Sequence, residues 1–185
     1  MPAIASETWL DEDELARRHA RLPPAPQDRG RVTQILARTP ARTRLLHQRT
    51  PVTESGGVPG DRWAAADEPK RAAQIAVMGH AVTTMIANGQ PLTLFGDNLA
   101  LALDLSEANL PVGSQVRIGT ATLVVTPKPH NGCHKYAARF GHAALRFIAA
   151  KERRPLHLRG IYFRVVSDGE IAVGDEVVIE HRGAA

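Results

Sequence analysis

The stretch QVRIGTATLVV, residues 115–125, decides the fold class of this chain of 185 residues. It consists of two short runs rich in β-branched residues, separated by Gly119-Thr120, and this pattern predicts a β-hairpin. Pro127, Pro129 and Gly132 follow at once and end the second strand. The hairpin therefore leads directly into a turn.

Strand signals dominate on both sides of this hairpin. Further strands are predicted at Val32–Leu36, Arg44–Gln48, Gln74–Met78, Gly160–Val166 and around Val177–Ile179. A helix is predicted at His80–Ala87, ended by Asn88-Gly89. Many short strands with few helices predict a mainly β protein with a β-barrel, rather than a βαβ sheet.

The turn after the hairpin carries Cys133, the only cysteine of the chain. We expect it in a strand-to-helix turn, among cationic side chains and at a helix N-terminus, and both features stabilise a thiolate. The cationic neighbours are Lys128, His130, His134, Lys135 and Arg139. A thiolate is a nucleophile and a metal ligand. The alternative is a buried cysteine that acts as a small apolar side chain.

A zinc site is a further alternative for this turn. Its ligands would come from His130, Cys133, His134 and His142, but their spacing matches no standard zinc pattern and a second cysteine is missing.

The composition limits the classes of protein to which this chain can belong. The apolar fraction of 43% and the charged fraction of 23% are ordinary for a soluble globular domain. A single cysteine fits a reducing compartment. No apolar stretch approaches the length of a membrane span, and the first residues lack a signal-peptide pattern. We therefore expect a cytoplasmic protein that does not bind membranes.

The charge is distributed unevenly along the chain. Residues 1–28 carry six acids and three arginines, which leaves residues 29–185 with a formal charge of about +7. Six arginines and no carboxylate lie between Arg29 and Arg49. With eight aromatic residues and no interleaved aromatic–basic stretch, we expect no nucleic-acid partner. A solvated face or a basic cleft for a small phosphorylated ligand remain as explanations.

The first 28 residues predict an appended helix with a proline-rich linker. Thr8 is expected to cap the helix, acids fill its first turns, arginines fill its last turn, and Pro23-Pro24-Ala25-Pro26 ends it. The predicted organisation is therefore an extension at 1–28 and a domain at 29–185.

Several segments, in order, resemble the molybdenum cofactor sulfurase C-terminal (MOSC) domain family. They are GGVPGDRW at 56–63, FGDNL at 95–99, LPVG at 110–113, VRIG at 116–119, Cys133, GIYFRV at 160–165, and Gly174-Asp175. The resemblance covers roughly residues 30–181. Neither the companion N-terminal β-barrel of longer members nor a pyridoxal-phosphate-dependent sulfurase is recognised in the sequence, so pyridoxal phosphate is not expected to bind.

The resemblance implies a MOSC-type β-barrel with a cleft for a molybdenum–pterin cofactor. It also implies that Cys133 is the catalytic residue and a metal ligand or sulfur acceptor. The residues that it places near the cofactor are Gly60, Asp61, Arg62, Asn98 and Arg164. A glycine-rich loop and arginines suit a cofactor that ends in a phosphate.

One departure from the family pattern concerns Gly96 and Asp97. Many members have an arginine two residues before the asparagine, where this chain has Gly96. The segment thus resembles the Phe-Gly-Glu-Asn-Leu motif of small stand-alone reductases of N-hydroxylated bases, with Asp97 in place of the glutamate.

Two functions remain open from the sequence. The first is a molybdenum-dependent reductase of N-hydroxylated compounds, which would need a separate electron-donor protein. The second is a carrier or binding module that holds a persulfide or the cofactor on Cys133 and exchanges it with a donor or partner protein.

Overall fold

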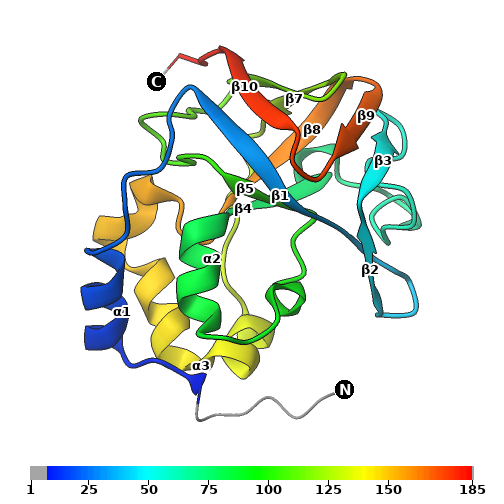
Figure 1. Cartoon of the computed structure of the whole chain (residues 1–185). Helices are drawn as coiled ribbons and strands as arrows, with labels where there is room; N and C mark the ends of the chain where they lie inside the picture. The colour runs from blue at the N-terminus through cyan, green and yellow to red at the C-terminus, as the bar shows by residue number, and fades with distance from the viewer. Residues whose placement is uncertain (1–7, 185) are drawn as a thin grey trace.

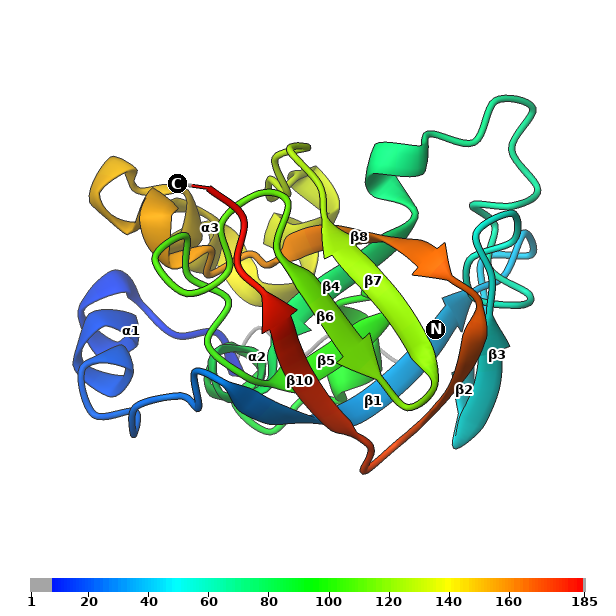
Figure 2. The ribbon, with the colours of Figure 1, turned by 90° about the horizontal axis from the view of Figure 1, so that it is seen from above.

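The predicted hairpin forms strands β6 (Gln115–Ile118) and β7 (Ala121–Val125), which pair antiparallel with Ile118 opposite Ala121. This computed structural model describes residues 8–184; residues 1–7 of the predicted extension, and residue 185, lie outside the described residues. The hairpin belongs to a closed barrel of seven strands (Figures 1 and 2). The other five are β1 (Arg29–Arg38), β4 (Ile75–Gly79), β5 (Leu99–Ala102), β8 (Ile161–Ser167) and β10 (Glu176–His181).

The barrel closes because β1 pairs with both β5 and β10. Around the wall the order is β1, β10, β6, β7, β8, β4 and β5, and β5 returns to β1. The alternating pattern in β8 explains its two faces, since Ile161, Phe163 and Val165 are buried and belong to the core inside the barrel. These findings confirm the predicted mainly β barrel.

Three strands, at residues 49–52, 99–102 and 169–172, were not predicted. β5 reads as a continuous apolar run, Leu99-Ala100-Leu101-Ala102, and pairs parallel with β4 through the crossover of helix α2 (His80–Ala87). The short strand β3 (Arg49–Val52) contains Pro51 and pairs with β9 (Gly169–Ala172), outside the barrel wall. Helix α2 ends as predicted, with Asn88 in the left-handed conformation at φ 45°.

Three helices form a second layer on one side of the barrel (Figure 1). They are α1 (Glu12–His19), α2 and α3 (His134–Ala149). Their buried side chains share a separate apolar core that includes Leu15, Met85, Phe140 and Phe147. Among the described helices, none combines the length and the apolar character that crossing a lipid bilayer requires.

Helix α1 forms within the predicted extension, but its cap differs from the prediction. The helix begins at Glu12, and the N-cap residue is Asp11, whose Oδ1 accepts a hydrogen bond from the backbone N–H of Glu14 at 2.8 Å. Thr8 is not the cap, because tertiary contacts hold the preceding residues: Trp9 Nε1 donates to Arg139 O at 3.0 Å, and Thr8 O accepts from Asn88 Nδ2.

The extension is packed into the helical layer rather than free of it. Leu15 is fully buried against the apolar core of α2 and α3, and Glu12 pairs with Arg146 on α3 at 2.9 Å. We expect Leu15→Ala to lower the free energy of unfolding by about 2–5 kcal/mol, since it leaves a cavity in this core. Urea denaturation measures the change, and the exposed Asp13→Ala is the matched control, with an expected change below about 0.5 kcal/mol. A Leu15→Ala variant as stable as the control would contradict the packing role of α1.

Candidate functional site

Cys133 is the N-cap residue of α3, so the predicted strand-to-helix turn is confirmed. Its carbonyl oxygen accepts hydrogen bonds from the backbone N–H groups of Tyr136 at 2.8 Å and Ala137 at 3.1 Å. Cys133 is exposed, which excludes the alternative of a buried apolar cysteine. The first backbone N–H groups of a helix carry partial positive charge, and this end of α3 therefore attracts anions.

A buried carboxylate holds the turn that carries Cys133. Arg159 Nη1 donates to both oxygens of Asp97, at 3.0 and 2.9 Å, and His130 Nε2 lies 3.3 Å from Asp97 Oδ1. Burial first, and then the charge of Arg159, lower the pKa of His130 to about 3, so its imidazole is neutral at pH 7. Asp97 precedes β5, Arg159 precedes β8, and His130 belongs to the turn, so one carboxylate joins three segments.

Tyr162 packs against this buried group. Its ring centroid lies 4.3 Å from that of His130. Burial is the main cause that raises the pKa of Tyr162, and the charge of Cys133 acts in the same direction. The hydroxyl is therefore protonated at neutral pH and is available as a hydrogen-bond donor.

Two half-buried arginines lie next to this group without a carboxylate partner among the described residues. Arg44 Nη2 and Arg139 Nη1 both donate to Leu94 O, at 3.3 and 2.7 Å. Burial, followed by the charge of a neighbouring arginine, lowers the pKa of each: Arg62 acts on Arg44, and Arg44 acts on Arg139. Cys133 acts on Arg139 in the opposite direction. We call Arg44, Arg62 and Arg139 the arginine cluster.

Gly96 allows the backbone to pass close to the arginine cluster. Its φ of +75° is a left-handed conformation that side chains other than glycine rarely adopt. A Cβ at this position would lie 3.7 Å from Arg44 Nε and 4.0 Å from Arg139 Nη1. The guanidinium groups therefore lie directly beside the Phe95–Asp97 backbone.

A second buried network lies behind the cluster and contains two residues predicted to contact the cofactor. Asp61 accepts hydrogen bonds from the Arg38 side chain at 3.0 Å and from Asn98 Nδ2 at 2.8 Å. Asn98 also donates to Leu36 O and accepts from the backbone N–H of Ala76, both at 3.0 Å, and is fully buried. These bonds occupy both the carbonyl oxygen and the amide nitrogen of the Asn98 side chain. Through them Asn98, which directly precedes β5, is joined to β1 at Leu36 and to β4 at Ala76.

The remaining predicted residues lie at the surface around this region. Gly60 is exposed with φ +78°, and Arg62 is exposed with its backbone N–H bonded to Arg38 O at 2.7 Å. Arg164 lies opposite Val124 on the outward face of β8, the face that also carries Tyr162. The structure thus brings Arg62 and Cys133 to one cationic region and places Asp61 and Asn98 in the network behind it. Contact of these residues with a cofactor stays a prediction.

The sequence named His130 and Arg139 as neighbours of Cys133 but did not identify Tyr162 or Arg159 as site residues. The position of Tyr162 between the buried Ile161 and Phe163 puts its side chain on the outward face of β8. Arg159 gave no local signal, because only the fold brings it to Asp97. Arg44 belongs to the arginine run between Arg29 and Arg49, but only the fold brings it to Arg139. Among residues 8–184, no three His, Cys, Asp or Glu side chains gather in a way that would hold a metal ion. The chain itself therefore offers one thiol ligand beside a set of cations.

The family model described as the MOSC domain matches residues 79–178, more than half of the chain. The match includes the last residue of β4, all of α2, Cys133 and the first half of β10. No curated protein sequence gives a match.

Solved structures share the fold at low sequence identity. YuaD from Bacillus subtilis has a TM-score of 0.60 and 18% identity, covering 80% of this chain and 94% of that chain. YiiM from Escherichia coli has a TM-score of 0.59 and 19% identity, covering 85% and 72%. YiiM from Geobacillus stearothermophilus has a TM-score of 0.55 and 21% identity, covering 88% and 78%. At these identities the likeness concerns the fold alone.

Proposed function

The chain belongs to the MOSC domain family, and we propose on this basis that it binds a molybdenum–pterin cofactor at Cys133 and reduces N-hydroxylated compounds. The observation that carries the proposal is the exposed Cys133 at the N-terminus of α3, near half-buried arginines that form no ion pair with a carboxylate among the described residues. A thiolate is a soft ligand of the kind that suits a metal with sulfur-rich coordination.

The residues present fit such a group. Nε of Arg44 is buried and has no hydrogen-bond partner among the described residues, and the cluster to which it belongs carries unbalanced positive charge. A terminal phosphate of the cofactor would supply the missing anion and accept charge-assisted hydrogen bonds from Arg44 and Arg139. Because the chain provides one thiol and no cluster of metal-ligating side chains within residues 8–184, the cofactor would bring the other ligands of its metal.

When bound, the cofactor supplies the electron-transfer chemistry, and the protein supplies binding, orientation and protons. Cys133 binds the metal, and the arginine cluster binds the anionic end of the cofactor. Tyr162 holds a proton at Oη and can donate a hydrogen bond to a polar substrate group beside Cys133. His130 is neutral, so it keeps the Cys133 turn in place through Asp97 without adding charge.

A reductase of this kind would need an electron-donor protein. Arg62 is exposed at the outer side of the arginine cluster, next to strand β2 (Arg44–His47) with its exposed Leu45 and Leu46. A basic surface with some apolar area suits an acidic donor, because complementary charge accelerates association. The same surface would receive a sulfur donor under the second candidate function.

The second candidate function is a carrier that holds a persulfide or the cofactor on Cys133 and passes it to a partner. The exposure of the thiol favours it, since a carried group must reach another protein. Pyridoxal phosphate has no role in either proposal, because in the family it belongs to fused sulfurase domains.

One experiment separates the two functions. The protein is purified from a host that makes the cofactor, and its molybdenum, pterin fluorescence and cyanide-labile sulfur are measured. Stoichiometric molybdenum with donor-dependent reduction of an N-hydroxylated base supports the reductase. Cyanide-labile sulfur without molybdenum supports the carrier, and the absence of molybdenum, pterin and labile sulfur overturns both.

The arginine cluster gives a graded prediction. We expect Arg44→Ala to weaken cofactor retention by roughly 1–3 kcal/mol, the scale of a charge-assisted hydrogen bond. Arg62→Ala is expected to weaken it by less, because an exposed charge is screened. Folding stability should change little, since Arg44 is packed beside other cations. Pterin release on gel filtration measures retention, with Arg117→Ala on β6 as the control. Equal retention in all three variants would remove the cluster from the binding site.

A further inference from the structure

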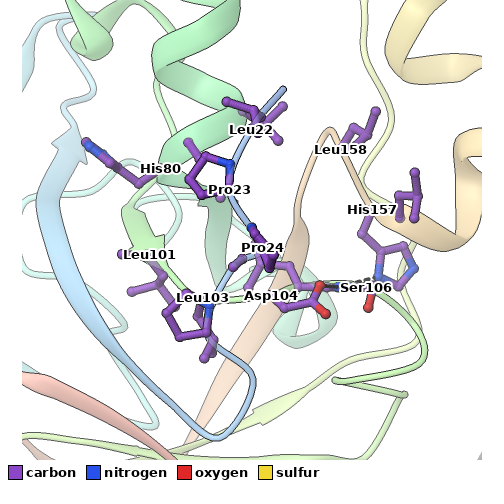
Figure 3. Close-up of a pocket in the computed structure, with 18 of the residues that line it drawn as sticks. Leu22, Pro23, Pro24, His80, Leu101, Leu103, Asp104, Ser106, His157 and Leu158 are labelled. Carbon is purple, nitrogen blue, oxygen red and sulfur yellow. Dashed lines mark hydrogen bonds between the residues drawn. The ribbon is translucent and has the colours of Figure 1, made fainter. Parts of the chain in front are cut away.

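A separate cavity lies between the N-terminal linker and the barrel, away from Cys133 and the arginine cluster. Its volume is about 410 Å³, which is within the usual range for small-molecule sites. Figure 3 shows Leu22, Pro23 and Pro24 of the linker facing Leu101, which lies in β5, and Leu103, which follows that strand. Most of the wall is therefore apolar, and the linker forms one side of it.

One end of this cavity is polar. Asp104, Ser106 and His157 lie close together there (Figure 3). The backbone N–H of Ser106 donates to Asp104 Oδ1 at 2.9 Å, and His157 Nδ1 lies 2.8 Å from Leu105 O. Because a carbonyl oxygen only accepts, Nδ1 of a neutral His157 carries the proton and Nε2 is left as an acceptor.

The polar end lacks a positive charge to balance Asp104. Among residues 8–184, no cationic side chain lies within ion-pair distance of its carboxylate. His19 also lines the cavity, but burial, and then the charge of Arg153, lower its pKa, so it is neutral at pH 7 and does not repel a cation. A half-buried carboxylate without a cationic partner is costly in an apolar surrounding.

The cavity is formed before any ligand binds, because backbone contacts hold the linker in place. The N–H of Asp104 donates to Pro26 O at 2.8 Å. The buried side chain of Asn109 donates both to Gln27 O at 2.9 Å and to Asp104 O at 2.8 Å. A rigid site loses little conformational entropy when a ligand enters.

The geometry points to this cavity as a binding site for an apolar, preferably ring-containing small molecule that bears a protonated amine. The ring would lie against Leu22, Pro23 and Leu103. The ammonium group would donate to Asp104, with Ser106 and His157 as further hydrogen-bond partners. This site goes beyond the proposed cofactor function, since neither Cys133 nor any residue of the arginine cluster lines the cavity.

Calorimetric titration of the full chain tests this inference with three indole probes that differ in charge. Tryptamine carries the ammonium group, tryptophol is its neutral counterpart, and indoleacetate is anionic. We expect tryptamine to bind about 10- to 100-fold more tightly than tryptophol, which corresponds to the 1.5–3 kcal/mol of a charge-assisted hydrogen bond. Indoleacetate should bind most weakly. If tryptophol or indoleacetate binds as well as tryptamine, or if no probe binds, the inference is wrong.

Variants place the binding in this cavity. Asp104→Asn keeps an acceptor for the Ser106 N–H but removes the charge, and should abolish the preference for tryptamine over tryptophol. Ala25→Phe fills the cavity from the linker and should weaken the binding of both tryptamine and tryptophol. Ala20 does not line the cavity, so Ala20→Phe should leave the binding of both probes unchanged. Circular dichroism checks that the variants fold. Cys133→Ser should leave tryptamine binding unchanged, so this result is independent of the cofactor proposal. A preference that survives both Asp104→Asn and Ala25→Phe would place the amine elsewhere.

Discussion

A Cys133→Ser variant is expected to lose essentially all bound molybdenum, or all cyanide-labile sulfur, while the fold is unchanged. The hydroxyl is nearly the same size as the thiol but is a hard and poorly ionised ligand. Because Cys133 is exposed and caps α3 through its backbone carbonyl, the free energy of unfolding should change by about 0.5 kcal/mol or less. Elemental analysis of the purified protein measures the loss.

The matched control for this variant is His134→Ala, which changes the exposed neighbour in the first turn of α3. It should keep the metal or sulfur content of the wild type. A Cys133→Ser protein with full molybdenum content and activity would reduce Cys133 to a structural residue and remove the basis of the proposed function.

The second large effect is expected at Asp61. Its carboxylate accepts hydrogen bonds from Arg38, Asn98 and the backbone N–H of Trp63, and its side chain is 2% exposed. Asp61→Ala should lower the free energy of unfolding by about 3–5 kcal/mol, because it leaves the Arg38 charge and the Asn98 amide without their partner. Urea denaturation of the protein without cofactor measures this effect. An Asp61→Ala variant that folds normally but fails to hold the cofactor would instead assign Asp61 to the binding site.

The Asp61 carboxylate also makes the folding stability depend on pH. Burial alone would raise the pKa of Asp61, but the hydrogen bonds and charge of Arg38 bring it below the ordinary value of 3.8. The unfolded chain therefore binds the proton more tightly than the folded protein, and the stability from Asp61 is present above about pH 4 and lost as the pH falls further. Asp61→Asn should show a shallower loss below pH 4 in denaturation curves, with Asp13→Asn as the control. Parallel acid dependence in all three proteins would exclude Asp61 as the cause.

Local sequence patterns predicted the barrel strands well where the period of two was visible. The hairpin at 115–125 and the alternation in 161–167 follow from which side chains face the barrel core. β5 was missed because its four residues are nearly all buried, so no alternation is left to see. β3 was missed because Pro51 weakens the strand signal, and its pairing with β9 depends on a partner more than 100 residues away.

The sequence by itself determined the barrel, the helix at 80–87 and the position of Cys133 between a strand and a helix. These features depend on periodicity, on turn residues and on breakers that act over a few residues. Only the tertiary structure decided what surrounds Cys133. Asp97, Arg159 and His130 come from three distant segments, and the arginine cluster comes from three others. The charges within each group act on one another across space, and no local pattern records which distant segments the closed barrel brings together.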